Sequence, residues 1–146
     1  MCNFDARRVE LFLSALKAWA SANRCVKGLA LVGSWGDASR DHAEADADVV
    51  LIVDDLDGFR TQSAWMADID WAAAGLGGGR WSECDSGPVC TRHFRFDDGA
   101  EIEVSFVSEQ WAAVDPVHPA TRRMAGSGMR VLHDPDGLLG RLLTTL

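Results

Sequence analysis

Long apolar runs are missing from this sequence. No stretch approaches the roughly 18 consecutive apolar residues that a membrane-spanning helix needs, so we expect no membrane span. The opening residues, MCNFDARRVE, lack the basic-then-apolar order of a secretory signal peptide. We therefore expect a cytoplasmic protein.

Paired cysteine motifs are also missing. The four cysteines form no CxxC pair, and no histidine stands beside them at zinc-ligand spacing. Cys84 and Cys90 can face each other across a hairpin, but in a reducing cytosol free, buried thiols are the expected state. A cysteine-bound metal is not expected.

Basic residues are few and scattered. The chain has 14 Lys and Arg against 22 Asp and Glu, a net charge of −8, and Arg40 is the one basic residue between positions 34 and 58. Proteins that bind extended nucleic acid usually need a basic face to neutralise the phosphates. We exclude that class of partner, whereas a small anionic ligand accompanied by divalent cations fits, because the metal supplies the positive charge.

Several common ligand-binding motifs are absent or incomplete. The sequence contains no GxxxxGK[ST], and the glycine-rich stretch 75–80 ends in Arg80 with no strand before it, so neither a P-loop nor a dinucleotide fingerprint is present. The stretches DDLDG and DPDG would put Val53 and Leu132 at the first ligand position of a calcium loop, where neither can coordinate. We expect both to be turns.

The length of 146 residues suits one domain over residues 1–146. Hydrophobic periodicity and turn residues predict an α/β fold in which helices pack against a mixed β-sheet. The expected helices span 5–23, 61–75, 119–125 and a last segment capped by Asp134 or Asp136, and in 61–75 Trp65, Ile69 and Ala72 share one face. The expected strands span 28–33, 48–53, a segment following 75–79, 89–96, 100–107 and 129–133. An Asp-Gly turn joins 89–96 to 100–107 as a hairpin.

Two aspartates precede an apolar strand. Asp46 and Asp48 are two positions apart, so on an extended chain both point to one face. Like charges this close are unfavourable unless a cation lies between them, and Mg²⁺ prefers such oxygen ligands. The alternative is a solvated strand end that carries no metal.

Two further features favour the metal site. Gly33-Ser34 ends the preceding apolar strand, where free backbone N–H groups and the Ser34 hydroxyl suit an anion. Glu101 and Glu103 lie on the strand 100–107, an unusual place for acidic residues. Glu103 lies deeper and is our candidate for the third carboxylate, whereas Glu101 suits a solvated edge.

These residues together resemble the nucleotidyltransferase superfamily, which includes DNA polymerase beta and the aminoglycoside nucleotidyltransferases. The resemblance rests on Gly-Ser followed by Asp-x-Asp and a distant acidic residue, and it extends to LALVGSW, ADADVVLIVDD and TRRMAGSGMRVLHDPDGLL. It spans about residues 29–139 and is closest to small bacterial stand-alone nucleotidyltransferase-domain proteins. The fold implied is a mixed sheet with packed helices.

The resemblance implies a role for each matching residue. Gly33 and Ser34 would grip the triphosphate of an NTP, with ATP expected, and Asp46, Asp48 and Glu103 would hold two Mg²⁺ ions. The implied reaction moves an NMP to a hydroxyl of a small molecule or protein, releases pyrophosphate, and uses Glu103 to help deprotonate the acceptor. Six further residues could contact phosphate or base because of their residue type: Arg40, Arg92, Arg95, Arg122, Arg123 and Trp35.

The loop after Ser34 departs from the family pattern. Gly36-Asp37-Ala38 stands where relatives often carry Ala-Arg-Gly, and Ala45 stands where Ser is frequent. Two alternatives therefore stay open: an antitoxin-like minimal nucleotidyltransferase that binds a helical partner protein, and a nucleotide-binding fold without turnover. An aminoglycoside-type acceptor would require a homodimer or another partner to complete its pocket.

Overall fold

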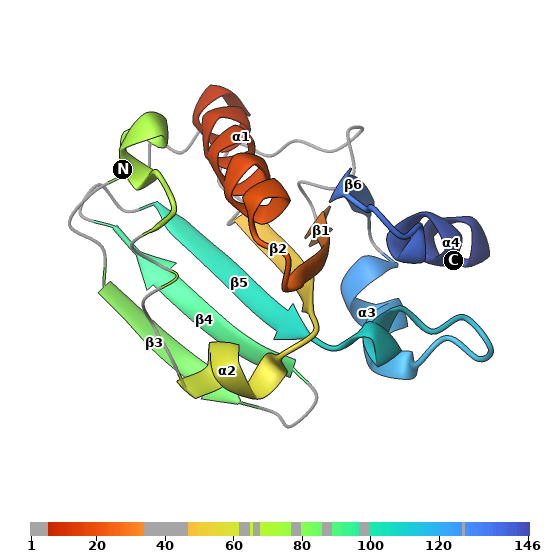
Figure 1. The fold of residues 1–146 in the computed structure, drawn as a ribbon. Helices are drawn as coiled ribbons and strands as arrows, with labels where there is room; N and C mark the ends of the chain where they lie inside the picture. Colours follow the sequence, from red (N-terminus) through yellow and green to blue (C-terminus); the bar gives the residue numbers. More distant parts are fainter. Residues whose placement is uncertain are drawn as a thin grey trace.

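The computed structural model describes residues 6–33, 47–61, 65, 68–76, 80–85, 89–96, 100–126 and 128–146. Figure 1 shows the arrangement of its elements. In chain order these are α1 (Ala6–Ala22), β1 (Val26–Val32), β2 (Ala47–Val53), α2 (Leu56–Thr61), the 3₁₀ helix η3 (Trp71–Ala74), β3 (Arg80–Asp85), β4 (Val89–Arg95), β5 (Glu101–Val107), the 3₁₀ helix η4 (Glu109–Ala112), α3 (Pro119–Ala125), β6 (Met129–His133) and α4 (Leu138–Thr145).

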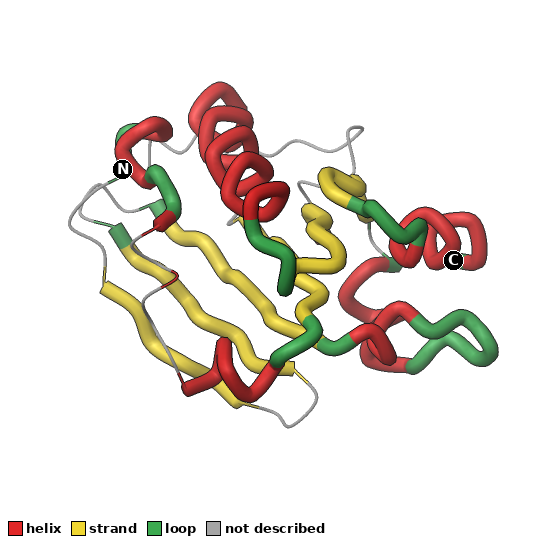
Figure 2. The backbone as a smooth tube through the Cα atoms, viewed as in Figure 1, coloured by secondary structure: helices red, strands yellow, loops and turns green. Residues whose placement is uncertain are grey.

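All six strands form one sheet in the order β3-β4-β5-β2-β1-β6. Figure 2 shows the strands running side by side across the molecule. Among the pairs of described strands, β2 and β5 run parallel and the others antiparallel. The predicted α/β fold with a mixed sheet and packed helices is confirmed.

The two faces of the sheet carry separate hydrophobic cores, because successive side chains of a strand point to opposite faces. On the first face, alternate residues of β1, β2, β4 and β5 pack with α1 and with an aromatic cluster around Trp65 and Phe106. On the second face, Val32, Val50 and Val107 pack with residues of η4, α3 and α4. Figure 1 shows α3 and α4 grouped beside β6, away from β3.

Helix α1 forms as its periodicity predicts. The apolar stripe is buried against the first face: Val9, Phe12, Leu13, Leu16 and Trp19. On the solvent side, Glu10 accepts hydrogen bonds from both terminal nitrogens of Arg130 on β6. The hydrogen bond from Arg130 lowers the pKa of the Glu10 carboxyl, as expected for a carboxylate held by a guanidinium. Within the described ranges, no helix combines the length and apolar character needed to span a membrane.

The predicted helix over 61–75 is wrong for the described residues from 65 onward. Trp65 and Asp68 have 3₁₀ conformation, Trp71–Ala74 form η3, and Ala72, expected on the buried face, is exposed. The reason lies in packing: Ile69 is buried, and Trp71 also packs against the same core. Residues two apart point to opposite sides of an α-helix, so an α-helix cannot bury both on one side. Packing into the aromatic cluster therefore determines the structure here, rather than the local hydrophobic periodicity.

The expected turn at DDLDG is likewise wrong, since α2 begins inside it. The Asp55 carboxylate accepts a hydrogen bond from the backbone N–H of Gly58 at 3.0 Å, which is the bond that an N-cap residue makes. Gly58 leaves room for this bond, because a Cβ there would lie 2.3 Å from Asp55 Oδ2 and would force the carboxylate to shift. Aspartate favours both turns and N-caps, so composition alone does not separate them.

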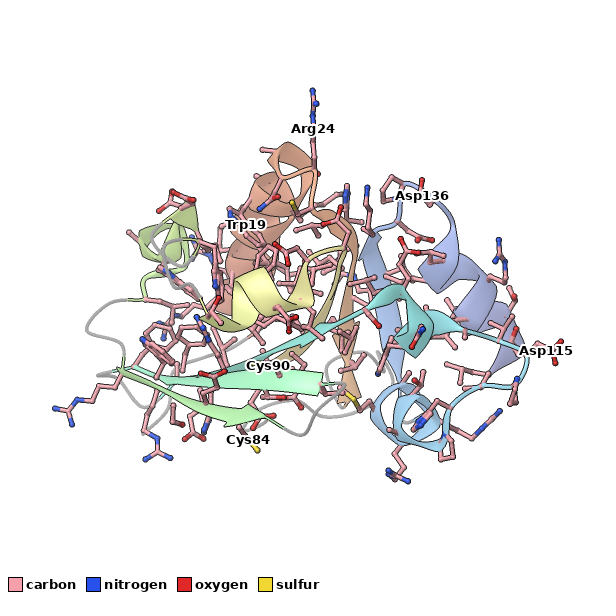
Figure 3. The ribbon with its side chains drawn as sticks, turned by 60° about the horizontal axis from the view of Figure 1, so that its bottom comes forward. Trp19, Arg24, Cys84, Cys90, Asp115 and Asp136 are labelled. Atoms are coloured by element: carbon pink, nitrogen blue, oxygen red, sulfur yellow. The ribbon has the colours of Figure 1, made fainter. Side chains whose placement is uncertain are left out.

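Cys25, Cys84 and Cys90 are free thiols, but of these three Cys90 alone is buried as predicted. Cys84 is paired with Thr91 rather than with Cys90 in the β3–β4 register, so the two cysteines point to opposite faces. Figure 3 shows Cys84 on the outer strand of the sheet, where it is exposed. Cys90 is buried, and its thiol donates a hydrogen bond to Glu83.

Asp134, one of the two predicted caps, caps α4. Its two carboxylate oxygens accept hydrogen bonds from the backbone N–H groups of Leu139 at 3.0 Å and Gly140 at 2.8 Å. These are among the N-terminal N–H groups that have no partner inside a helix. Asp136, the other predicted cap, is exposed at the outer side of the same turn (Figure 3).

We predict that Asp134→Ala lowers the free energy of unfolding by about 1–2 kcal/mol, because two N–H groups at the start of α4 lose their acceptor. Chemical denaturation followed by tryptophan fluorescence measures the change. Asp136→Ala is the matched control and should alter stability by less than about 0.5 kcal/mol. Equal effects of the two substitutions would contradict the assigned cap.

Candidate functional site

A polar row crosses the second face of the sheet. Ser82, His93, Glu103 and Asp48 are successive Cα partners across β3, β4, β5 and β2. Directly opposed residues on neighbouring strands have side chains about 5 Å apart on the same face. The two carboxylates therefore stand next to each other, although they are 55 residues apart in the chain, the difference between positions 48 and 103.

The row ends at a cavity of about 250 Å³. Val32 of β1 is the Cα partner of Asp48, so the end of β1 and its following residue Gly33 come to the same place. The cavity is lined by Val32, Gly33, Asp48, Glu103, Ser105, Arg123 and Met124. It thus gathers residues from β1, β2, β5 and α3.

The backbone conformation of Gly33 and its lack of a side chain leave room at this cavity. Its φ of +77° lies in the left-handed region that glycine adopts without strain, and a Cβ there would lie 3.3 Å from Asp48 Oδ2. Its N–H, however, donates to the carbonyl of Gly128 at 3.1 Å. That N–H is therefore already used and does not serve as the anion donor that we expected at this position.

The same hydrogen bond positions α3. Gly128 accepts from Gly33 and donates its own N–H to the carbonyl of Ala125, the last residue of α3. Near the other end of the helix, the buried hydroxyl of Thr121 donates to the Trp111 carbonyl at 2.7 Å. With both ends attached, α3 lies beside the end of β1, and Arg123 and Met124 reach the cavity.

Three of the predicted site residues meet in this cavity: Gly33, Asp48 and Glu103. Asp46, Ser34 and Arg40 lie outside the described residues, as does Trp35. Glu101 is not part of the cavity; its carboxylate accepts a hydrogen bond from Arg95 Nε at 2.9 Å and lies 3.7 Å from His93 Nε2. Of the two glutamates, Glu103 thus lines the cavity and Glu101 does not.

Arg92, predicted to contact the nucleotide, lies on the opposite face of the sheet. Its side chain is 1% exposed, and its guanidinium lies 5.3 Å from the Trp65 ring and 4.6 Å from the Trp81 ring. Arg92 Nη2 also donates to the carbonyl of Phe59 at 3.2 Å. The structure thus does not bring Arg92 to Asp48 and Glu103, and its contacts are those of a buried structural cation.

The donor chemistry of the cavity suits a hard divalent cation, which prefers oxygen ligands. Asp48 and Glu103 each offer a half-buried carboxylate. In the part of the chain that the structure describes, no group of three or more acidic, histidine or cysteine side chains comes together to hold a metal ion. The described residues hence provide two carboxylates, and Asp46 is the further ligand that the sequence predicts.

Sequence reasoning missed Ser105 and could not rank Arg123. Ser105 is buried on the floor of the cavity, where its hydroxyl shares a hydrogen bond with Thr91 at 2.9 Å. A serine between the apolar residues Val104 and Phe106 was the available signal. Arg123 was one of several arginines of equal standing, and only the position of α3 separates it from Arg122, which does not line the cavity.

Comparison with known proteins finds similarity to solved structures. No protein-family model matches the chain, and no curated protein matches it. Among solved structures it is similar to an aminoglycoside 6-adenyltransferase from Bacillus subtilis, with a TM-score of 0.48 and 14% sequence identity over 72% of this chain. The match spans 36% of that protein.

We predict that Arg92→Ala lowers the free energy of unfolding by about 2–4 kcal/mol, because it removes a buried cation packed between two indole rings. Thermal and chemical denaturation measure the loss. The matched control is Arg95→Ala, whose side chain is 70% exposed and which should cost less than about 1 kcal/mol. Unchanged stability of Arg92→Ala together with weaker nucleotide binding would restore the nucleotide-contact role.

Proposed function

We propose that this chain is a divalent-metal-dependent nucleotidyltransferase, which moves an NMP from an NTP to an acceptor hydroxyl. The observation that carries the proposal is the opposition of Asp48 and Glu103 on parallel strands beside Gly33. Two carboxylates in direct opposition repel each other, and a cation bound between them offsets that repulsion. A cation-binding role accounts for their retention at the wall of a cavity.

The fit of a metal–nucleotide complex rests on the donor set. Asp48 and Glu103, together with Asp46, would supply carboxylate oxygens to two Mg²⁺ ions. When bound, the metal would neutralise charge on the attacking and leaving oxygens of the phosphoryl group. Gly33 leaves space beside the Asp48 carboxylate, and Ser34 is the proposed hydroxyl donor to the triphosphate.

The proposed reaction is an in-line displacement. The acceptor oxygen forms a bond to the α-phosphorus while the bond from that phosphorus to the β-bridging oxygen breaks, and pyrophosphate leaves with the bonding electrons. Glu103 helps to remove the proton of the acceptor hydroxyl. We propose ATP as the NTP and a small-molecule or protein hydroxyl as the acceptor.

An open surface beside the carboxylates gives the acceptor access. Five side chains of β3 and β4 that point to the second face are exposed or half-buried: Ser82, Cys84, Thr91, His93 and Arg95. The acceptor can therefore approach Glu103 across β4 while the nucleotide occupies the cavity toward β1. This arrangement separates the two substrates on either side of the reacting phosphorus.

We predict that Mg²⁺ with an NTP raises the melting temperature of the wild-type protein and that pyrophosphate is released when a suitable hydroxyl is supplied. Asp46→Asn, Asp48→Asn and Glu103→Gln should each lower the release rate at least about a hundredfold, because each removes a carboxylate from the metal site. A differential thermal shift across the four NTPs and a coupled pyrophosphate assay provide the measurements.

Glu101→Gln is the matched control, since it changes a carboxylate on the same strand and face, two residues away, and should retain activity within about threefold. Stabilisation by Mg²⁺ and NTP without release would assign the chain to the nucleotide-binding proteins without turnover. Absence of both effects in the wild type would refute the nucleotidyltransferase function.

A further inference from the structure

Among the described residues that line the cavity, one carries a charge opposite to that of the two carboxylates. Arg123 of α3 lines it together with Asp48 and Glu103. Gly33 uses its N–H on Gly128, and Arg92 points to the other face. Of the described residues that line the cavity, Arg123 is thus the one that brings a cationic donor.

We propose that Arg123 binds the phosphate chain of the nucleotide, a role that rests on the proposed function. Its guanidinium presents several N–H groups in a planar fork that matches phosphate oxygens and forms charge-assisted hydrogen bonds. A cavity that pairs two carboxylates with one arginine suits a ligand of matching charge pattern. A metal-complexed polyphosphate has that pattern, because its metal faces carboxylates and its free phosphate oxygens face a guanidinium.

The backbone under Arg123 is held in place. The hydrogen bond from Gly128 to Ala125 lies two residues after Arg123, and Thr121 is attached to Trp111 two residues before it. The side chain itself is exposed, and among the described residues no hydrogen bond or ion pair holds its guanidinium. A fixed base with an unengaged head group allows the guanidinium to meet a ligand without breaking an existing contact.

The overall charge makes such a group necessary. The chain carries a net charge of −8, and both Asp48 and Glu103 repel an approaching anion. Arg123 comes from a different part of the chain and supplies a positive charge at the cavity itself.

The neighbouring residue provides a matched control. Arg122 has the same side chain, lies on the same seven-residue helix and is exposed, but it does not line the cavity. The two arginines change the net charge and the helix equally when replaced. Any difference between Arg123→Ala and Arg122→Ala therefore reports the position of the guanidinium.

The test is calorimetric titration of the full chain with a non-hydrolysable ATP analogue and with tripolyphosphate, both in excess Mg²⁺. We expect Arg123→Ala to weaken binding of both ligands at least about tenfold, because a charge-assisted contact is lost. Arg122→Ala should bind within about twofold of the wild type, and Arg123→Lys should fall between, since it keeps the charge but loses the fork. Circular dichroism checks that α3 and the sheet are intact in each variant.

The outcomes separate the two proposals. If Arg123→Ala binds both ligands as tightly as the wild type while Asp48→Asn loses affinity, the role of Arg123 is refuted and the nucleotidyltransferase function stands. If Arg123→Ala and Arg122→Ala weaken binding equally, the effect is one of general charge, and the specific role is again refuted. If the wild type binds neither ligand, both proposals fail.

Discussion

The parallel pairing of β2 with β5 determines where the candidate site lies. Because the pairing is in register from Ala47 to Ile52, it places Asp48 opposite Glu103 and fixes the separation of their Cα atoms. A shift of one residue would send one carboxylate into the apolar core on the other face. The apolar residues that follow both acids, such as Val49 and Val104, hold this register by burial. The hydrophobic core thus keeps two like charges together, which they would not do by themselves.

One face of the sheet forms a closed hydrophobic core, and the other carries the candidate site. The first face is closed by α1 and the aromatic cluster, and it buries even a cation, Arg92, between indole rings. On the second face, the described helices α3, α4 and η4 pack over β1, β2 and β6 and over the ends of β4 and β5 at Val89 and Val107. Glu103 lies at the boundary between the covered and the open part. A carboxylate at such a boundary is partly desolvated, so it binds cations more strongly than in bulk water, and yet a ligand can reach it.

Much of this arrangement could be predicted from the sequence, because burial there follows local periodicity. Helix α1, the β4–β5 hairpin, α3 and β6 all form where the alternation of apolar residues indicates. The segment 61–75 could not be predicted, since Ile69 and Trp71 pack into a cluster formed by distant strands rather than onto one helical face. The same limit applies to the arginines: Arg92 and Arg123 are equivalent in sequence, and only the sheet register and the position of α3 separate a buried cation from a cavity residue.

The site therefore depends on contacts between segments that are distant in the chain. Gly33 joins the end of β1 to Gly128, and Gly128 joins α3 through Ala125, so one short chain of backbone hydrogen bonds connects the carboxylate strands to the arginine helix. Each link is a main-chain hydrogen bond. The two residues with positive φ in this series, Gly33 at +77° and Gly128 at +149°, are both glycines. Side chains at these positions would add strain and, at Gly33, crowd the Asp48 carboxylate. The two glycines thus act on the site through geometry, by setting the distance between its negative and its positive groups.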